Sequence, residues 1–232
     1  MLEEKLAIEL YNAYVNRKEI EPFQIGFYSA KKVFQIFSSM ITQSEGFGGY
    51  KISFTTQEAL KKYQITEPLI GILSKRMIIK EGNEVDLWFK NSMAEVELVY
   101  ELENCTLSEF PSCVKNIYLG VEVPGTRFST WNLTAAQILA DDCAASRLYV
   151  GVPVEMGFNR TVELYLNGNK VREGRPSYVF GSSDNVVKWL LRRVVSITGF
   201  VSSGVFVGPI NIKSGDKIRL KSENIEYEVR FN

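Results

Sequence analysis

The stretch Ala94-Glu-Val-Glu-Leu-Val-Tyr100 alternates acidic and apolar residues, as a β-strand with one buried face does. Successive side chains of a strand point to opposite faces, so Glu95 and Glu97 share one face. A third glutamate, Glu122, lies inside the next apolar segment, Ile117-Tyr-Leu-Gly-Val-Glu-Val123. Carboxylates placed inside two successive strands are the most informative feature of this chain.

Two interpretations of these glutamates are open on spacing alone. Three carboxylates brought together would raise one another's pKa by repulsion, and a hard divalent cation such as Mg²⁺ or Mn²⁺ would relieve that repulsion. The alternative is a solvated sheet face or a charged edge, because Glu101 and Glu103 continue the same parity. Glu-x-Glu pairs are common on exposed strands, so the spacing does not decide between the two.

The chain contains no histidine, which excludes histidine triads, imidazole-bound zinc and histidine general bases. Acid–base chemistry near neutral pH would need a carboxylate with a raised pKa, a lysine with a lowered pKa, or a metal-bound water. Lys51 is the candidate lysine, because it follows the glycine-rich loop 45–49 at the start of a predicted strand, 50–54. The alternative is an ordinary surface lysine.

Length and composition indicate a folded chain. Its 232 residues are 45% hydrophobic, and 27 basic residues balance 27 acidic ones, which argues against disorder and against a nucleic-acid or membrane-surface partner. No leader pattern and no run of eighteen apolar residues occurs, so we expect a cytoplasmic protein. Three cysteines without Cys-x-x-Cys spacing favour buried free thiols over a disulfide or zinc site: Cys105, Cys113 and Cys143.

The spacing of apolar residues predicts helices in the first part of the chain and mostly strands in the rest. Helical spacing over 2–16 and 33–41, a strand at 50–54 and a short helix at 56–63 define a small helical N-terminal region, 1–65. A strand-rich region, 66–232, follows. Strands are predicted at 69–74, 77–80, 85–89, 95–103, 116–123, 147–151, 161–166, 170–171, 203–212 and 217–231.

Two helices and one hairpin interrupt these strands. One helix is capped by Thr134 and runs to about Ala145, and the other opens at Ser183 or Asp184. Asn167-Gly168 is a strong hairpin signal. The order indicates an α+β chain with a strongly bent or rolled sheet rather than a doubly wound one.

Four segments follow the order of a known family. Gly49–Thr56 resembles a Gly-x-Lys-x-Gly-Leu-Thr-Ser motif, Gly71–Met77 resembles Gly-x-Leu-x-x-Asp-Met, and 94–100 is similar to a Glu-Ala-Glu-Ile-Ala-Phe strand. The spacing from Glu122 to an Arg, a Trp and an Ala-Asp pair is kept at Arg127, Trp131 and Ala140-Asp141. Together these segments resemble the hydratase and decarboxylase branch of the fumarylacetoacetate hydrolase superfamily, which includes 2-oxopent-4-enoate (2-hydroxypenta-2,4-dienoate) hydratases and 4-oxalocrotonate decarboxylases.

The resemblance implies a fold and a site. The fold would be the superfamily's mixed β-sheet roll or barrel, of its C-terminal-domain type, with the small helical region packed against it. Glu95, Glu97 and Glu122 would bind Mg²⁺ or Mn²⁺, and Lys51 would carry a proton. The substrate-binding residues would lie in one short segment: Leu73, Ser74, Lys75 and Arg76.

The resemblance also implies an activity. The leading expectation is a lyase of the hydratase type, which adds water to a 2-hydroxydienoate or 2-oxo-alkenoate to give a 4-hydroxy-2-oxo acid, as in aromatic catabolism. The alternatives are a decarboxylase or tautomerase on the same metal-enolate chemistry, or a non-catalytic partner subunit. Homo-oligomers, or a hetero-complex of decarboxylase and hydratase subunits, would be the expected assembly.

The chain departs from the family pattern near the expected site. Arg76 stands where an aspartate is usual, Ala144 where a serine is usual, and Asp142 where an asparagine is usual. A guanidinium binds carboxylates well, so we expect Lys75 or Arg76 to bind a second carboxylate of the substrate.

Overall fold

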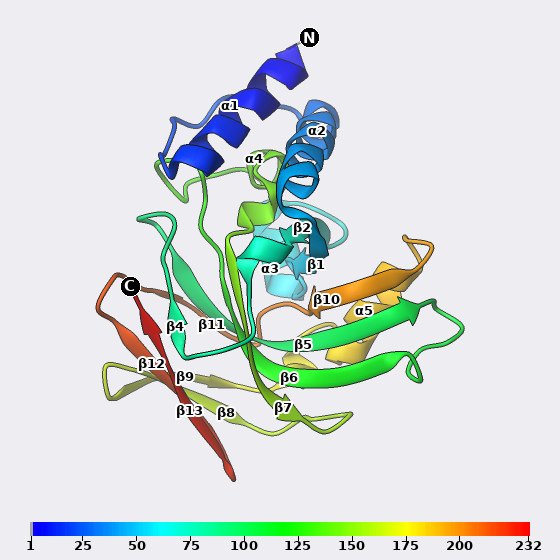
Figure 1. The fold of residues 1–232 in the computed structure, drawn as a ribbon, viewed down its shortest axis with the longest axis vertical. Helices are drawn as coiled ribbons and strands as arrows, with labels where there is room; N and C mark the ends of the chain where they lie inside the picture. The colour runs from blue at the N-terminus through cyan, green and yellow to red at the C-terminus, as the bar shows by residue number, and fades with distance from the viewer. Residues whose placement is uncertain (1) are drawn as a thin grey trace.

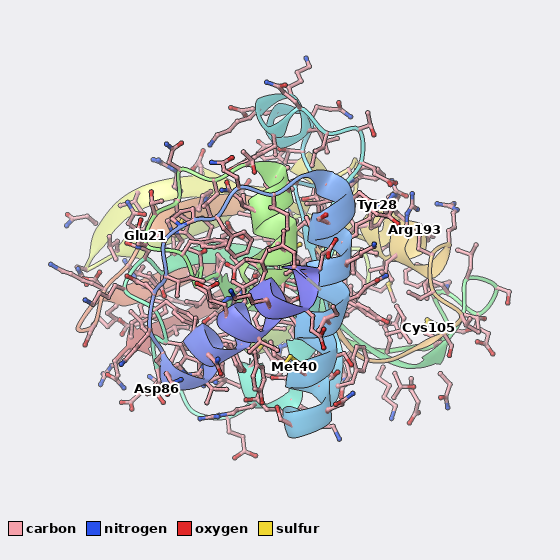
Figure 2. All side chains as sticks on the ribbon, turned by 90° about the horizontal axis from the view of Figure 1, so that it is seen from above. Glu21, Tyr28, Met40, Asp86, Cys105 and Arg193 are labelled. Carbon is pink, nitrogen blue, oxygen red and sulfur yellow. A yellow bond between two sulfur atoms is a disulfide. The ribbon has the colours of Figure 1, made fainter. Side chains whose placement is uncertain are left out.

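The computed structural model describes residues 2–232. Three helices, α1 (Leu2–Asn16), α2 (Phe27–Glu45) and α4 (Ala135–Ala140), lie on one side of a strongly curved sheet, and a second sheet lies below it (Figure 1). Viewed from above, α1 crosses α2 over the rest of the molecule (Figure 2). The predicted α+β class with a rolled sheet is confirmed.

The larger sheet has eight strands and carries the residues of interest. Its order is β2-β1-β10-β5-β6-β7-β3, with β11 paired to β5. The strands are β1 (Phe47–Ser53), β2 (Leu69–Ser74), β3 (Ile78–Ile79), β5 (Met93–Cys105), β6 (Val114–Val123), β7 (Arg147–Val154), β10 (Ile197–Ser202) and β11 (Val207–Asn211).

The smaller sheet has five strands in the order β4-β13-β12-β8-β9. They are β4 (Glu84–Val85), β8 (Val162–Leu166), β9 (Asn169–Gly174), β12 (Lys217–Ser222) and β13 (Ile225–Phe231). The remaining helices are α3 (Gln57–Tyr63) and α5 (Ser183–Leu191). In the predicted hairpin, Asn167 and Gly168 both have positive φ, of 49° and 88°, as a type I′ turn requires.

The two faces of the larger sheet bury two separate cores. Val96, Leu98 and Val121 face the smaller sheet and α5, whereas Val99 and Leu148 face the helices. Because side chains alternate along a strand, Glu95, Glu97 and Glu122 have the parity of the helix-facing set. The glutamates therefore point into the layer between the larger sheet and the helices.

The predicted helix from Thr134 to about Ala145 is too long. The Thr134 hydroxyl does cap it, by accepting a hydrogen bond from the Gln137 backbone N–H at 3.2 Å. The helix ends at Ala140, because three successive residues then take left-handed φ values between 49° and 56°: Asp142, Cys143 and Ala144. This turn lets Asp142 Oδ1 accept a hydrogen bond of 2.8 Å from the Ile72 N–H on the edge strand β2.

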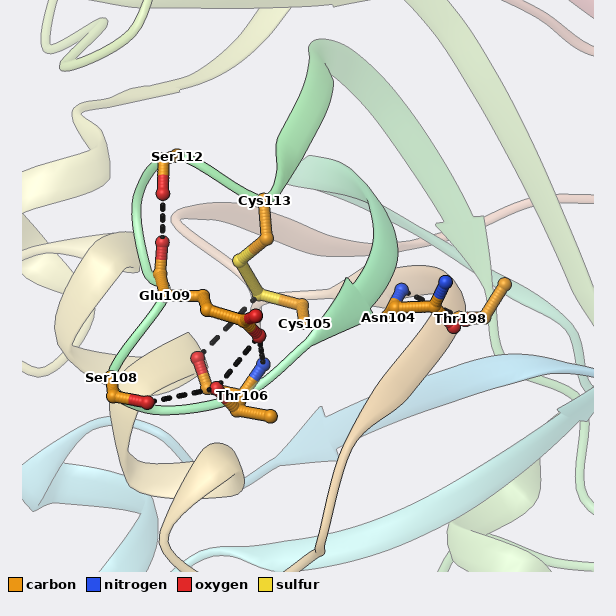
Figure 3. The surroundings of a disulfide bond; sticks show 8 residues. All are labelled: Asn104, Cys105, Thr106, Ser108, Glu109, Ser112, Cys113 and Thr198. Atoms are coloured by element: carbon orange, nitrogen blue, oxygen red, sulfur yellow. Dashed lines mark hydrogen bonds between the residues drawn. A yellow bond between two sulfur atoms is a disulfide. The ribbon is translucent and has the colours of Figure 1, made fainter.

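The cysteine prediction is wrong for two of the three residues. Cys105 at the end of β5 and Cys113 just before β6 are joined by a disulfide, with Cα atoms 5.1 Å apart (Figure 3). The antiparallel pairing of β5 with β6 brings the two ends together, which residue spacing alone did not reveal. Seen from above, Cys105 lies towards one side of the molecule (Figure 2), but its side chain is fully buried. Cys143 is a buried free thiol, as predicted.

The predicted boundary near residue 65 stays a prediction. Strand β1 comes from the N-terminal region and pairs with β10 on one side and β2 on the other. Among residues 2–232, no helix is long and apolar enough to cross a membrane.

Candidate metal centre and its cavity

The pairing of β5 with β6 brings the three glutamates together. Glu95 lies directly opposite Glu122 in the antiparallel register, and Glu97 is two residues further along the same face. One carboxylate oxygen from each of the three lies within 4.8 Å of the others. A single cation with oxygen ligands at about 2.0–2.6 Å can reach all three.

Burial separates these glutamates from the rest of their strand. Glu97 and Glu122 are each 1% exposed and Glu95 is half-buried, whereas Glu103 is exposed. The start of β5 lies beneath the helices and its end projects towards solvent. The interpretation as a solvated face therefore fits Glu103 but not the three converging carboxylates.

The electrostatics of the cluster fit a divalent cation. Burial and the charge of Glu122 raise the pKa of Glu95 to about 8. Burial and then the charges of Glu122 and Glu95 raise the pKa of Glu97 well above its ordinary value. Three carboxylates face one ammonium, so full ionisation leaves two negative charges in excess, which a cation of charge +2 would balance.

That ammonium belongs to Lys51, which is 2% exposed and forms an ion pair with Glu122. Burial by itself lowers the pKa of Lys51, but Glu122 and Glu95 raise it, and the net direction is upward. Gly71 lies opposite Lys51 on β2, and a Cβ there would come within 2.8 Å of the Lys51 Cγ. The interpretation of Lys51 as a surface lysine is wrong.

Two donors that sequence reasoning missed hold Glu97 in place. The Ser202 hydroxyl and the Gly204 backbone N–H both donate to Glu97 Oε2, at 2.6 and 2.7 Å. Ser202 is the last residue of β10, which pairs with β5, and Gly204 follows it by two residues. The sequence predicts a strand over 203–212 and none over 197–202, so no local pattern indicated this support. Only the pairing of β10 with β5 shows which side chain it holds.

A cavity of about 680 Å³ opens beside the cluster. Lys51, Glu95 and Glu97 line it together with residues of α3 and of the loop that precedes α3. Its apolar walls are Ile52, Phe54, Ala59, Tyr63, Met93, Pro124, Trp131, Ile138, Val205 and Phe206. The Thr55 hydroxyl also lies at this cavity, is buried, and has no hydrogen-bond partner among residues 2–232, so it is available to a bound ligand.

None of the four residues of the predicted substrate-binding segment lines this cavity, and a role for them in substrate binding stays a prediction. Leu73 is fully buried in the core beneath the helices, and the Ser74 hydroxyl donates to Glu45 Oε2 at 2.6 Å. Strand β2 ends at Ser74, and the chain then turns towards the end of α2. Lys75 is exposed there, and the 64% exposed Arg76 lies 3.5 Å from Glu45.

A second buried ion pair supports the loop beyond Glu122. Arg127 and Asp141 are both fully buried and paired, and the Thr126 hydroxyl donates to Asp141 at 2.7 Å. The neighbouring Asp142 is also fully buried, and burial raises its pKa to about 7. Its Oδ2 has no partner among the described residues.

Comparison with known proteins agrees with this geometry. No protein-family model matches the chain. A 4-oxalocrotonate decarboxylase from Pseudomonas sp. is 20% identical over 192 residues, which cover 76% of this chain and 75% of that protein. The solved structure of 4-oxalocrotonate decarboxylase from Pseudomonas putida G7, complexed with magnesium and adipate, has a TM-score of 0.87 and 19% identity. That match covers 100% of this chain and 97% of the other.

More distant structures share part of the fold. Fumarylpyruvate hydrolase from Pseudomonas aeruginosa, in complex with Mn²⁺ and pyruvate, has a TM-score of 0.59 and 14% identity over 78% of this chain and 88% of its own. A putative fumarylacetoacetate hydrolase family protein from Yersinia pestis CO92 has a TM-score of 0.58 and 14% identity over 79% and 92%. The chain therefore has the fold of the fumarylacetoacetate hydrolase superfamily, in the form seen in 4-oxalocrotonate decarboxylase.

Proposed function

We propose that this protein is a metal-dependent lyase that acts on 2-oxo acids. The observation that carries the proposal is the convergence of Glu95, Glu97 and Glu122 with Lys51 at one wall of a cavity large enough for a small acid. The similar decarboxylase and hydrolase structures that hold Mg²⁺ or Mn²⁺ support it.

The three glutamates would hold Mg²⁺ or Mn²⁺. Bound there, the cation would supply Lewis acidity that favours the enol form of a 2-oxo acid. Ser202 and Gly204 keep Glu97 oriented through their hydrogen bonds to Oε2. The Lys51 ammonium would be repelled by a divalent cation at the glutamates, which would lower its pKa, so that Lys51 Nζ could give or take a proton at a carbon of the bound acid. The apolar cavity walls limit access of water.

Two reactions fit such a site. Decarboxylation is favoured by the match to 4-oxalocrotonate decarboxylase, which covers the whole chain. Hydration of a 2-hydroxydienoate remains the prediction from the sequence motifs. Both reactions proceed through the enol of a 2-oxo acid, so one experiment tests what they share and a second separates them.

The shared test is exchange of C3 protons of a simple 2-oxo acid in D₂O, followed by NMR with Mg²⁺ or Mn²⁺ present. We expect metal-dependent exchange, and we expect Glu97→Gln and Lys51→Gln each to lower its rate by at least about 100-fold. A loss of about 100-fold is the largest that is typical when a group that only supports a metal ligand is replaced, so residues in direct contact with the metal or the substrate should lose at least as much. Glu103→Gln, an exposed glutamate of the same strand, is the matched control and should leave exchange unchanged.

A protein that binds Mn²⁺ tightly but exchanges no C3 proton would contradict the enzymatic proposal and support the non-catalytic subunit. If exchange occurs, CO₂ release from a dicarboxylic 2-oxo-alkenoate identifies a decarboxylase. Formation of a 4-hydroxy-2-oxo acid from a 2-hydroxydienoate identifies a hydratase.

A further inference from the structure

Three arginine side chains meet around the ring of Trp88, outside the cavity described above. The guanidinium carbon of Arg17 lies 3.5 Å from the centre of the ring, that of Arg147 4.5 Å and that of Arg76 5.4 Å. None of these four residues lines the cavity beside the glutamates. Like charges gathered at one ring repel one another, so the arrangement favours the binding of an anion.

Packing between distant segments brings the arginines together. Arg17 follows the end of α1, Arg76 lies in the short 3₁₀ turn after β2, and Arg147 opens β7. Ile78 pairs with Leu148, and this register of β3 with β7 lets Arg147 Nη1 donate to the Arg76 carbonyl oxygen at 2.6 Å. The group therefore links the end of the first helix to the edge of the larger sheet.

Two buried nitrogens of this group have no partner. Arg17 Nη1 donates to the Tyr14 carbonyl oxygen at 2.9 Å, but Arg17 Nη2 and Arg147 Nε are buried and find no acceptor within residues 2–232. A buried charged donor without an acceptor costs more free energy than an ordinary lost hydrogen bond. An anion rich in oxygen atoms would supply both acceptors.

Glu45 balances one of the three charges. Its Oε1 lies 3.5 Å from Arg76 Nη1, and its Oε2 accepts hydrogen bonds from the Tyr14 and Ser74 hydroxyls at 2.7 and 2.6 Å. Both oxygens are therefore engaged with groups other than Arg17 and Arg147.

The charges of Arg17 and Arg147 are not neutralised by close ion pairs. Asp86 attracts Arg147, but it is exposed, and no ion pair joins the two in the described part of the chain. Burial lowers the pKa of Arg17 and of Arg147, and the charge of Arg76 lowers both further. Arginine remains protonated in proteins, so two positive charges lie here without a paired carboxylate.

We propose that Arg17, Arg76 and Arg147 form a binding site for a phosphate group, with their guanidinium groups held at the Trp88 ring by cation–π contacts. A guanidinium binds phosphate through two parallel hydrogen bonds, and a phosphate group carries a charge of about −1.5 to −2 near pH 7, which matches the two unpaired arginines. The site needs neither a metal nor a 2-oxo acid, so the proposal is independent of the proposed function.

The test is isothermal titration calorimetry of the whole chain with inorganic phosphate, with chelator present so that no cation at the glutamates binds phosphate. Arg17→Gln and Arg147→Gln should each weaken binding by at least about tenfold, because each removes a charged donor that no other group replaces. Arg192→Gln removes an exposed arginine at the end of α5 and is the matched control, which should bind phosphate as the wild type does.

A further variant covers the case in which loss of a half-buried arginine unfolds the chain. Arg76 is 64% exposed, so Arg76→Gln should keep the far-UV circular dichroism of the wild type. It should weaken phosphate binding by about two- to fivefold, as expected for a solvent-accessible ion pair.

Two other probes define the ligand. Acetate, with a single negative charge, should bind at least about fivefold more weakly than phosphate. Glycerol 3-phosphate separates two sources of the phosphate group: binding tighter than that of inorganic phosphate indicates a small phosphate ester, and weaker binding indicates the free ion. The inference is overturned if the wild-type chain binds no phosphate, if acetate binds as tightly, or if Arg192→Gln loses as much affinity as the variants at Trp88.

Discussion

Single carboxyl groups in this protein depend on their neighbours for their properties. Glu97 and Glu103 lie on the same strand and at positions of the same parity. Glu97 is buried and accepts two hydrogen bonds, whereas Glu103 is exposed to solvent. Asp142 is a fully buried carboxyl group outside the glutamate cluster. Its Oδ1 accepts a hydrogen bond from the Ile72 N–H, and its Oδ2 has no partner among residues 2–232. Ionising this buried carboxyl group costs free energy of folding, so its contribution to stability can be measured as a function of pH.

We predict that Asp142 lowers stability as pH rises. Burial raises its pKa from 3.8 to about 7, so between these values the native state holds a proton that the unfolded state has lost, and the free energy of unfolding falls with rising pH. Asp142→Asn should flatten this decline by up to about 1.4 kcal/mol per pH unit. Urea unfolding from pH 4 to 8, with chelator present, measures it. The exposed Asp86→Asn variant should keep the wild-type slope, and an unchanged slope in Asp142→Asn would refute the prediction.

At the scale of elements, the end of β10 and the residues that follow it hold Glu97 in the glutamate cluster, together with strands β5 and β6, which carry the three glutamates. Gly204 has a φ of +99°, and its N–H donates to Glu97 while its Cα faces the Thr55 side chain. A Cβ at this position would lie 2.1 Å from Thr55 Oγ1 and 2.8 Å from Thr55 Cβ. Only glycine accommodates both the backbone conformation and this contact.

Gly204→Ala should therefore weaken Mn²⁺ binding by about tenfold, because displacement of the loop removes a donor that orients a metal-binding carboxylate. Gly215→Ala is the matched control. Its φ is +89° but nothing lies within 4 Å of a Cβ, so it should lose about 1 kcal/mol of stability and keep metal affinity. Calorimetric titration with Mn²⁺ and urea unfolding separate the two effects. Equal losses of affinity in both variants would show that the contact with Thr55 does not matter.

The whole molecule is organised around one sheet shared by both predicted regions. Strand β1 from residues 1–65 lies between β2 and β10, and the helices α1 and α2 bury their apolar residues in the core that also contains Val99 and Leu148. Lys51 on β1 pairs with Glu122 on β6. Separating the regions would leave two strand edges unpaired and the glutamates without their ammonium.

We accordingly expect a single cooperative unfolding transition. Trp189 reports on the core beneath α5, whereas Trp88 packs against the core that α1 and α2 share with the larger sheet. The fluorescence of single-tryptophan variants therefore follows each core separately, and the core that Trp88 reports on is the one that contains the apolar residues of the N-terminal helices. Both signals and far-UV circular dichroism should change at the same urea concentration. An earlier transition at Trp88 would instead support two independently stable regions divided near residue 65.

The sequence by itself determined the alternation that makes 94–100 and 117–123 strands, the Asn167-Gly168 turn, and the candidate set of Glu95, Glu97, Glu122 and Lys51. These are local patterns or recurring motifs, and strand parity alone places two glutamates on one face. Tertiary structure alone decided that the three carboxylates converge in a buried layer. It also decided that Cys105 meets Cys113, and that Arg76 meets Arg17 and Arg147 at Trp88. Register between strands and the direction of a chain after a strand depend on packing between distant segments, which no local pattern specifies.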